Sequence, residues 1–310
     1  MLDRNARSAA WEQTLPAEVR KAVERVTGSI VRAESVARKR SLGTALVLKA
    51  ERGRTFFLKA ARKDSAEFAR LNREFLVNAC KPSTVPAPAF IKPIWEGKHA
   101  ALLFEYVEGR NADLSFGHPD VSHVIDMSRR LSYIRAWDGL PSVMGEIPAL
   151  METVKVARSL STQDQIVFAT ALDRFDPCTL AGDRVIHYDL HPANLRITRN
   201  GEIFAVDWET AYSGAPFIDA VMLMMILVVC GHPTDMAEKL VRSGGPEYAN
   251  APRDSVTGLL ALLTLNCEHA ARFGPEGTRQ IRGQAAQAGR SLLNHLMDDE
   301  TGGYEDRSDL

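Results

Sequence analysis

Three polar side chains that could act together lie within residues 185–209 of this 310-residue chain: Asp189, Asn194 and Asp207. One amide oxygen and one or two carboxylate oxygens that meet at a point suit Mg²⁺, which takes oxygen ligands and usually keeps several waters and substrate phosphates. Asn194 and Asp207 are therefore the predicted metal ligands. Asp189 can face a metal-bound phosphate without being a ligand, which is the position for a group that accepts the proton of an attacking hydroxyl.

A β-hairpin is predicted to bring the two candidate ligands together. Residues 195–197 and 203–206 alternate like short strands, and the turn between them contains Asn200-Gly201. Asn194 comes just before the first strand and Asp207 just after the second. The hairpin therefore predicts that their side chains lie close to each other.

These residues resemble a known family. The chain contains three motifs that are similar to the catalytic and metal-binding loops of the aminoglycoside phosphotransferases, which are small-molecule kinases. They are His-Tyr-Asp-Leu-His-Pro-Ala-Asn-Leu, then Val-Asp-Trp-Glu-Thr-Ala, then Gly-Ala-Pro-Phe-Ile-Asp. Protein kinases would have His-Arg-Asp and Asp-Phe-Gly, whereas this chain has Tyr188 and Trp208-Glu209. Asp219, which ends the third motif, matches a family aspartate that holds the catalytic loop from a helix start.

The resemblance implies an α+β, two-lobed protein-kinase-like fold. Its N-terminal lobe would contain an antiparallel sheet and one main helix, and its C-terminal lobe would be mainly helical. A strand at residues 100–105 leads to the connection between the lobes near Gly109. We therefore expect a nucleotide-binding lobe over residues 1–108 and a catalytic, acceptor-binding lobe over residues 109–310.

Lys59 is the candidate partner of the nucleotide phosphates. It follows the apolar strand pattern that begins at Thr55, and Lys49 is its competitor because both end similar strands. Residues 65–79 have apolar positions at helical spacing. In the family a glutamate on this helix orients the lysine, and Glu74 fits Lys59, whereas Glu67 is too near.

Two further nucleotide contacts follow from the resemblance. The loop that covers the phosphates would contain Ser41 and Gly43, although it is basic rather than glycine-rich, and a solvated hairpin tip is an equal alternative. Adenine would meet backbone groups of the segment from Glu105 to Val107, where almost any side chain is compatible with binding.

The implied reaction is transfer of the γ-phosphoryl group of ATP or GTP, with Mg²⁺, to a hydroxyl of a small molecule. An antibiotic is the first expectation for this acceptor. The alternatives are a metabolic kinase for an amino alcohol such as choline, a homoserine-like compound or a sugar, and a catalytically silent regulatory module. Polycationic acceptors would require an acidic pocket, yet the carboxylates of the helical region, such as Glu268 and Asp235, are scattered among arginines.

Composition excludes other classes of function. The net charge of −1 creates no overall field for nucleic acid or an anionic membrane. The four cysteines have no metal-site or disulfide spacing, and the start of the chain lacks the apolar core of a signal peptide. The most apolar run, residues 217–230, is too short to span a bilayer. We therefore expect a cytoplasmic enzyme, monomeric or homodimeric, with no membrane partner.

Overall fold

The computed structural model describes residues 11–36 and 43–302, with side chains described as far as residue 298. These residues form two compact units. One contains the described residues up to Arg110 together with Arg196–Thr210, and the other contains Asn111–Leu195 and the described residues from Ala211 onward. The division of roles between two lobes, 1–108 and 109–310, stays a prediction.

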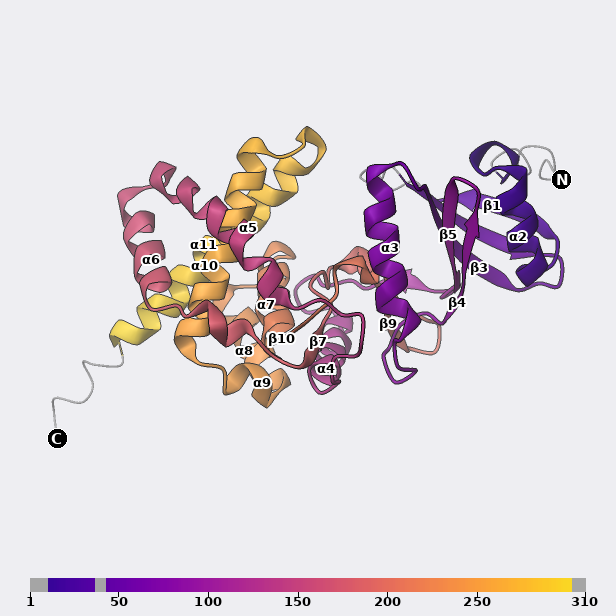
Figure 1. Cartoon of the computed structure of the whole chain (residues 1–310). Helices are drawn as coiled ribbons and strands as arrows, with labels where there is room; N and C mark the ends of the chain where they lie inside the picture. Colours follow the sequence, from indigo (N-terminus) through magenta and orange to yellow (C-terminus); the bar gives the residue numbers. More distant parts are fainter. Residues whose placement is uncertain (1–10, 37–42, 303–310) are drawn as a thin grey trace. The chain divides into compact units, whose positions relative to one another are not determined.

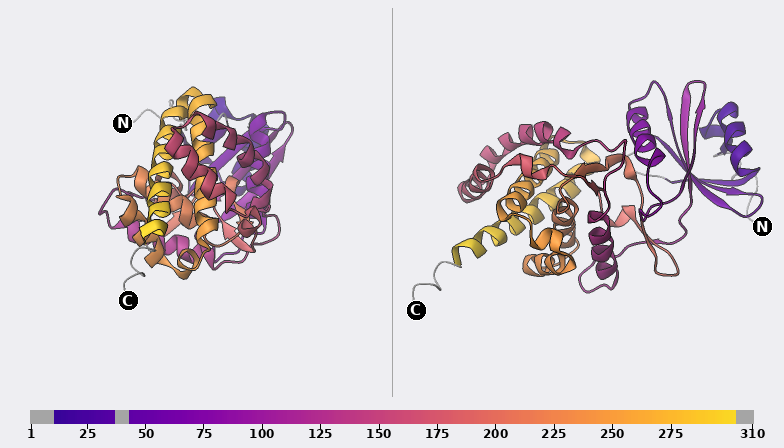
Figure 2. Two further views of the ribbon diagram at one scale, coloured as in Figure 1. Left: turned by 90° about the vertical axis from the view of Figure 1, so that its left-hand side faces the viewer. Right: turned by 60° about the horizontal axis from the view of Figure 1, so that its bottom comes forward.

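The first unit is built on a five-stranded antiparallel sheet in the order β1-β2-β3-β5-β4. Helix α2 (Ala17–Thr27) lies on one face of this sheet and helix α3 (Ala66–Ala79) on the other, as Figures 1 and 2 show. The strands are β1 (Ile30–Ser35), β2 (Thr44–Ala50), β3 (Thr55–Arg62), β4 (Phe90–Glu96) and β5 (His99–Glu105).

Alternation along the central strands makes two separate apolar layers, because successive side chains in a strand point to opposite faces. In β3, Phe56 and Leu58 belong to the layer beneath α2, whereas Phe57 and Ala61 belong to the layer beneath α3. Lys59 has the same parity as Phe57 and Ala61. The strand therefore directs this lysine toward α3, the helix that contains Glu74.

The second unit is mainly helical. Its most apolar helix, α7, has seven buried residues, and the long helices α10 and α11 form an antiparallel pair joined at Gly274-Pro275 (Figure 1). The helices are α4 (Asp120–Ser132), α5 (Ile147–Thr153), α6 (Thr162–Asp173), α7 (Ile218–Val229), α8 (Thr234–Gly244), α9 (Pro246–Ala249), α10 (Arg253–Phe273) and α11 (Glu276–Gly302). In the described part of the chain, no helix combines the length and the apolar character that crossing a membrane requires.

Residues 149–160 have apolar positions at helical spacing, but only part of this segment is α-helical. Helix α5 ends at Thr153, and a 3₁₀ helix continues over Val154–Ser159 and packs against α6 and α10.

Two small sheets bring the catalytic segments into place. Strand β7 (Arg184–Ile186) pairs antiparallel with β10 (Tyr212–Gly214), and β8 (Leu195–Ile197) lies between β6 (Arg110–Asn111) and β9 (Ile203–Ala205). The predicted hairpin at residues 195–206 is confirmed. Its turn has Gly201 at φ 81°, a conformation that favours glycine.

Gly182 permits a close backbone approach just before β7, and replacing it tests this packing. A Cβ atom at this position would lie 2.3 Å from the carbonyl oxygen of Gly214. We expect Gly182→Ala to lower the free energy of unfolding by roughly 1–3 kcal/mol, as overpacking does. Gly145→Ala is the control, because no atom lies within 4 Å of its added Cβ. Equal denaturant midpoints for the two variants would contradict the prediction.

Candidate active site

A buried ionic cluster in the first unit joins β3, α3 and the segment after β9. The ammonium group of Lys59 donates to both carboxylate oxygens of Glu74, at 2.8 and 2.6 Å, and to Oδ1 of Asp207 at 2.5 Å. Glu74 is only 2% exposed. The predicted contact between Lys59 and Glu74 is confirmed, and Asp207 joins it from far along the sequence.

The cluster has more negative than positive groups. Burial alone would lower the pKa of Lys59, but the carboxylates of Glu74 and Asp207 raise it above its usual value, so this lysine is a cation. Carboxylate oxygens of Glu74, Asp207 and Glu209 lie within 4.8 Å of one another. Carboxylate oxygens are hard donors, and three of them this close together suit a divalent cation such as Mg²⁺.

Asp207 has an unusual backbone conformation. Its φ is 71°, in the left-handed region that few residues other than glycine adopt. The next residue, Trp208, is buried, and its indole Nε1–H donates to the carbonyl of Ala205 at 2.8 Å. Strained backbone persists only where the surroundings hold it, and the buried indole is one such support for the Asp207 carboxylate.

Asp219 holds the loop of the second unit that contains the candidate base Asp189. This aspartate is the second residue of α7, and its two carboxylate oxygens accept the backbone N–H groups of His187 and Tyr188, each at 2.8 Å. Tyr188 has φ 64°, so the residue before Asp189 is also left-handed. His187 is fully buried. The role anticipated for Asp219 from the motif is confirmed.

Asn194 holds Asp189 directly. Its Nδ2 donates to Oδ2 of Asp189 at 2.8 Å and to the backbone carbonyl of the same residue at 3.0 Å. These contacts use the nitrogen of the amide, so Oδ1 is the atom with which Asn194 would bind a cation. Nε2 of His191 lies 3.4 Å from Oδ2 of Asp189. The two predicted metal ligands belong to different units, and their pairing therefore stays a prediction.

The structure describes three of the four other residues that were predicted to contact the nucleotide. Ser41 lies outside the described residues, and Gly43 directly precedes β2. Glu105 ends β5, and its N–H donates to the carbonyl of Ala89 at 2.9 Å, so that donor is already used within the unit. Val107 follows in the irregular segment after β5. The roles of all four residues stay predictions.

Sequence reasoning gave no role to Glu209, although the residue stands in the quoted motif. Its place in the carboxylate group depends on the 3₁₀ turn over Trp208–Thr210, which packs against α3. The motif Asp-Trp-Glu was a signal for it, but spacing alone could not show that the second acid faces Glu74.

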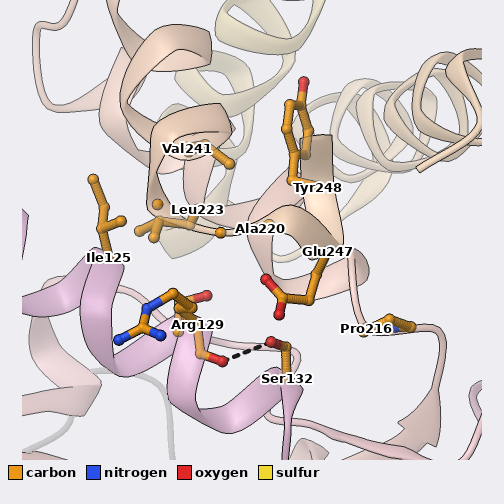
Figure 3. Close-up of a pocket in the computed structure, with 12 residues that line it drawn as sticks. Ile125, Arg129, Ser132, Pro216, Ala220, Leu223, Val241, Glu247 and Tyr248 are labelled. Carbon is orange, nitrogen blue, oxygen red and sulfur yellow. Dashed lines mark hydrogen bonds between the residues drawn. The ribbon is translucent and has the colours of Figure 1, made fainter. Parts of the chain in front are cut away.

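A cavity in the second unit is too small for an acceptor. It lies among α4, α7, α8 and α9, where Arg129, Tyr248 and Glu247 contribute to its wall (Figure 3). Its volume of about 20 Å³ suits a single water molecule.

Comparison with known proteins identifies the class. A family model described as the phosphotransferase enzyme family matches residues 41–252, so the chain belongs to that family. Among curated protein sequences, none matches this chain significantly. The predicted family is confirmed, and the chain is a phosphotransferase of the kind that acts on hydroxyl groups.

Solved structures confirm the two-lobed kinase-like fold. An aminoglycoside phosphotransferase from Alicyclobacillus acidocaldarius has a TM-score of 0.65 and 16% identity, covering 92% of this chain and 96% of that one. Choline kinase LicA from Streptococcus pneumoniae has a TM-score of 0.59 and 12% identity, with coverage of 89% and 98%. Amicoumacin kinase hAmiN, in complex with AMP-PNP, Ca²⁺ and Ami, has a TM-score of 0.52 and 12% identity, with coverage of 90% and 95%.

The raised pKa of Asp219 predicts how the stability of the folded protein depends on pH. Burial raises the pKa of this carboxyl from 3.8 to about 6, against the opposing effect of its two N–H donors. The folded protein therefore binds this proton more tightly than the unfolded chain does. The resulting stabilisation is complete below pH 3.8 and is lost as the pH rises through 6.

We expect the unfolding free energy of the wild type, relative to Asp219→Asn, to fall by on the order of 3 kcal/mol between pH 4 and pH 7. Denaturant titrations of both proteins at several pH values would measure this difference. Asp126→Asn is the control, because Asp126 is an exposed partner of Arg129 on α4. A difference between wild type and Asp219→Asn that stays constant with pH would contradict the prediction.

Proposed function

We propose that this phosphotransferase uses ATP or GTP and Mg²⁺ to phosphorylate a hydroxyl group of a small molecule, with an antibiotic as the first candidate. The observation that carries the proposal is the placement of Lys59 between Glu74 and Asp207. A buried lysine fixed by two carboxylates is an oriented cation, and such a cation can bind nucleotide phosphates. Phosphoryl transfer depends mainly on positioning and charge neutralisation, which these groups supply.

Each residue has a defined part in the proposed reaction. Lys59 binds the phosphates, and Glu74 orients its ammonium group. Asn194 and Asp207 would hold Mg²⁺, which neutralises phosphate charge when bound. Asp189, fixed by Asn194, accepts the proton of the acceptor hydroxyl or orients that hydroxyl for in-line attack.

The candidate acceptors come from the family resemblance and from proteins with the same fold. Among structures with this fold, one is an amicoumacin kinase in complex with Ami and another is a choline kinase, so kinases named for different small molecules share similar scaffolds. An antibiotic remains the first candidate because the motifs resemble those of aminoglycoside phosphotransferases.

The charges of the helical unit favour an acceptor that is not strongly cationic. Glu268 accepts from Arg272 at 2.6 Å and from Arg290 at 2.5 Å, and Asp235 pairs with Lys239 at 3.2 Å. Carboxylates that already face cations of their own chain attract a polycation less strongly. This observation supports the second candidate, a metabolic kinase whose acceptor has at most one positive charge.

Acceptor-dependent release of ADP or GDP tests the proposal. The panel would contain aminoglycoside, macrolide, nucleoside and peptide antibiotics, together with choline, homoserine and simple sugars. We expect Asp189→Ala to lower kcat about 10²- to 10⁴-fold, because general acid–base groups contribute that much. Asp173→Ala, at an exposed site where α6 ends, is the control. Turnover that survives Asp189→Ala would remove the proposed base.

A second variant tests the metal ligand. We expect Asp207→Ala to abolish saturable dependence of the rate on Mg²⁺ at millimolar concentrations, since the variant lacks a carboxylate ligand. Rates would be measured across a Mg²⁺ series at fixed nucleotide concentration, with Asp64→Ala, an exposed aspartate of the same unit, as the control. An unchanged Mg²⁺ dependence would show that Asp207 is not a ligand.

A further inference from the structure

Lys81 lies beside the ionic cluster in the first unit but has no part in the reaction proposed above. It follows the end of α3, two residues after Ala79. Its Nζ donates to the carbonyl oxygen of Pro88 at 2.9 Å and lies 5.8 Å from the centre of the Trp208 ring. An ammonium group over the face of an indole is attracted by the negative charge of that face.

Three segments meet at this lysine. Trp208 directly follows Asp207, and its indole is tied to the carbonyl of Ala205. The N–H of Ala205 donates in turn to the carbonyl of Pro86 at 2.8 Å, and Pro86 belongs to the same loop as Pro88. Lys81 therefore connects the end of α3, the loop before β4 and the turn that contains the proposed metal ligand.

Burial of the Lys81 side chain disfavours the charged form of its ammonium group. Burial lowers the pKa of its ammonium group to about 8, while the carboxylate of Glu74 acts in the opposite direction. A solvated surface lysine would avoid this cost. The backbone carbonyl of Pro88 and the indole face of Trp208 are the groups that compensate this cost. Trp208 directly follows Asp207, and the loop that contains Pro88 is bonded to Ala205 through Pro86.

We propose that Lys81 is a positioning residue that holds the Trp208 ring and thereby keeps the adjacent Asp207 carboxylate oriented for a divalent cation. This inference rests on the proposed role of Asp207 as a metal ligand. For removal of the Lys81 ammonium group, a positioning role and a purely electrostatic role predict opposite changes in cation affinity. Removal of a nearby positive charge would strengthen cation binding, whereas loss of a support weakens it.

The test compares Lys81→Met with Lys81→Arg. Methionine keeps the length and apolar stem of the side chain without its charge, and arginine keeps the cation that stacks on the indole. Mg²⁺ binding would be measured by calorimetry in the presence of saturating AMP-PNP, and the Mg²⁺ dependence of turnover would be measured in parallel. The control is Lys63→Met, because Lys63 also donates to a backbone carbonyl, that of Gly97 at 2.9 Å, but is exposed.

We expect Lys81→Met to weaken Mg²⁺ binding on the order of 10-fold, as loss of an outer support of a metal ligand does, with Lys81→Arg and Lys63→Met within about twofold of wild type. Thermal melts would confirm that each variant is folded. If Lys81→Met unfolds, the inference is decided by Lys81→Gln, which is expected to show the same weakening.

Three results would overturn the inference: unchanged Mg²⁺ affinity in Lys81→Met, tighter binding in that variant, or equal losses in the methionine and arginine variants. Failure of the proposed function is distinguishable from these. A wild-type protein that binds Mg²⁺ with AMP-PNP but phosphorylates no acceptor leaves the calorimetric comparison intact. A wild-type protein that binds no Mg²⁺ overturns both proposals.

Discussion

The ion cluster of Lys59, Glu74 and Asp207 is the constraint on which the arrangement of the first unit depends. A buried ion pair is a weak source of stability, because removing charges from water offsets much of their attraction. The geometry of the ion cluster shows how the elements of this unit must be placed. It requires β3 to present Lys59 on the face covered by α3, α3 to present Glu74 toward the strand, and the segment after β9 to return to the same point. One ammonium group thus fixes three elements relative to one another.

The two loops that carry the candidate base and a candidate metal ligand, one in each unit, both have a left-handed residue beside a buried support. Tyr188 and Asp207 both have left-handed backbones, and each stands within one residue of a buried support: the Asp219 contacts at His187 and Tyr188, and the indole of Trp208 beside Asp207. A left-handed residue other than glycine is disfavoured in a free chain. Its presence beside a candidate catalytic carboxylate and at a candidate metal ligand indicates that orientation, rather than stability, determines these conformations.

Local periodicity explains why part of this arrangement could be predicted. The strand pattern before Lys59 and the helical pattern around Glu74 placed these residues on a strand and a helix, because each pattern fixes which face a side chain occupies. The family resemblance then indicated that the two residues pair. Glu209 and Lys81 were not predicted as members of the site. Their positions depend on a 3₁₀ turn and on a contact between residues 81 and 208, and such long-range contacts leave no periodic signal. The end of α5 at Thr153 has no signal in the sequence either, because the apolar spacing continues into the 3₁₀ segment.

Reaction and acceptor depend on different parts of the chain. Phosphoryl transfer requires a few oriented charges, and proteins of the same fold share only 12–16% of their sequence with this chain. Recognition of an acceptor depends on side chains that no motif fixes. In α10 and α11 the pairing of Glu268 with Arg272 and Arg290 neutralises a carboxylate that could otherwise attract an amine. This charge pairing supports the proposal of an acceptor with low positive charge.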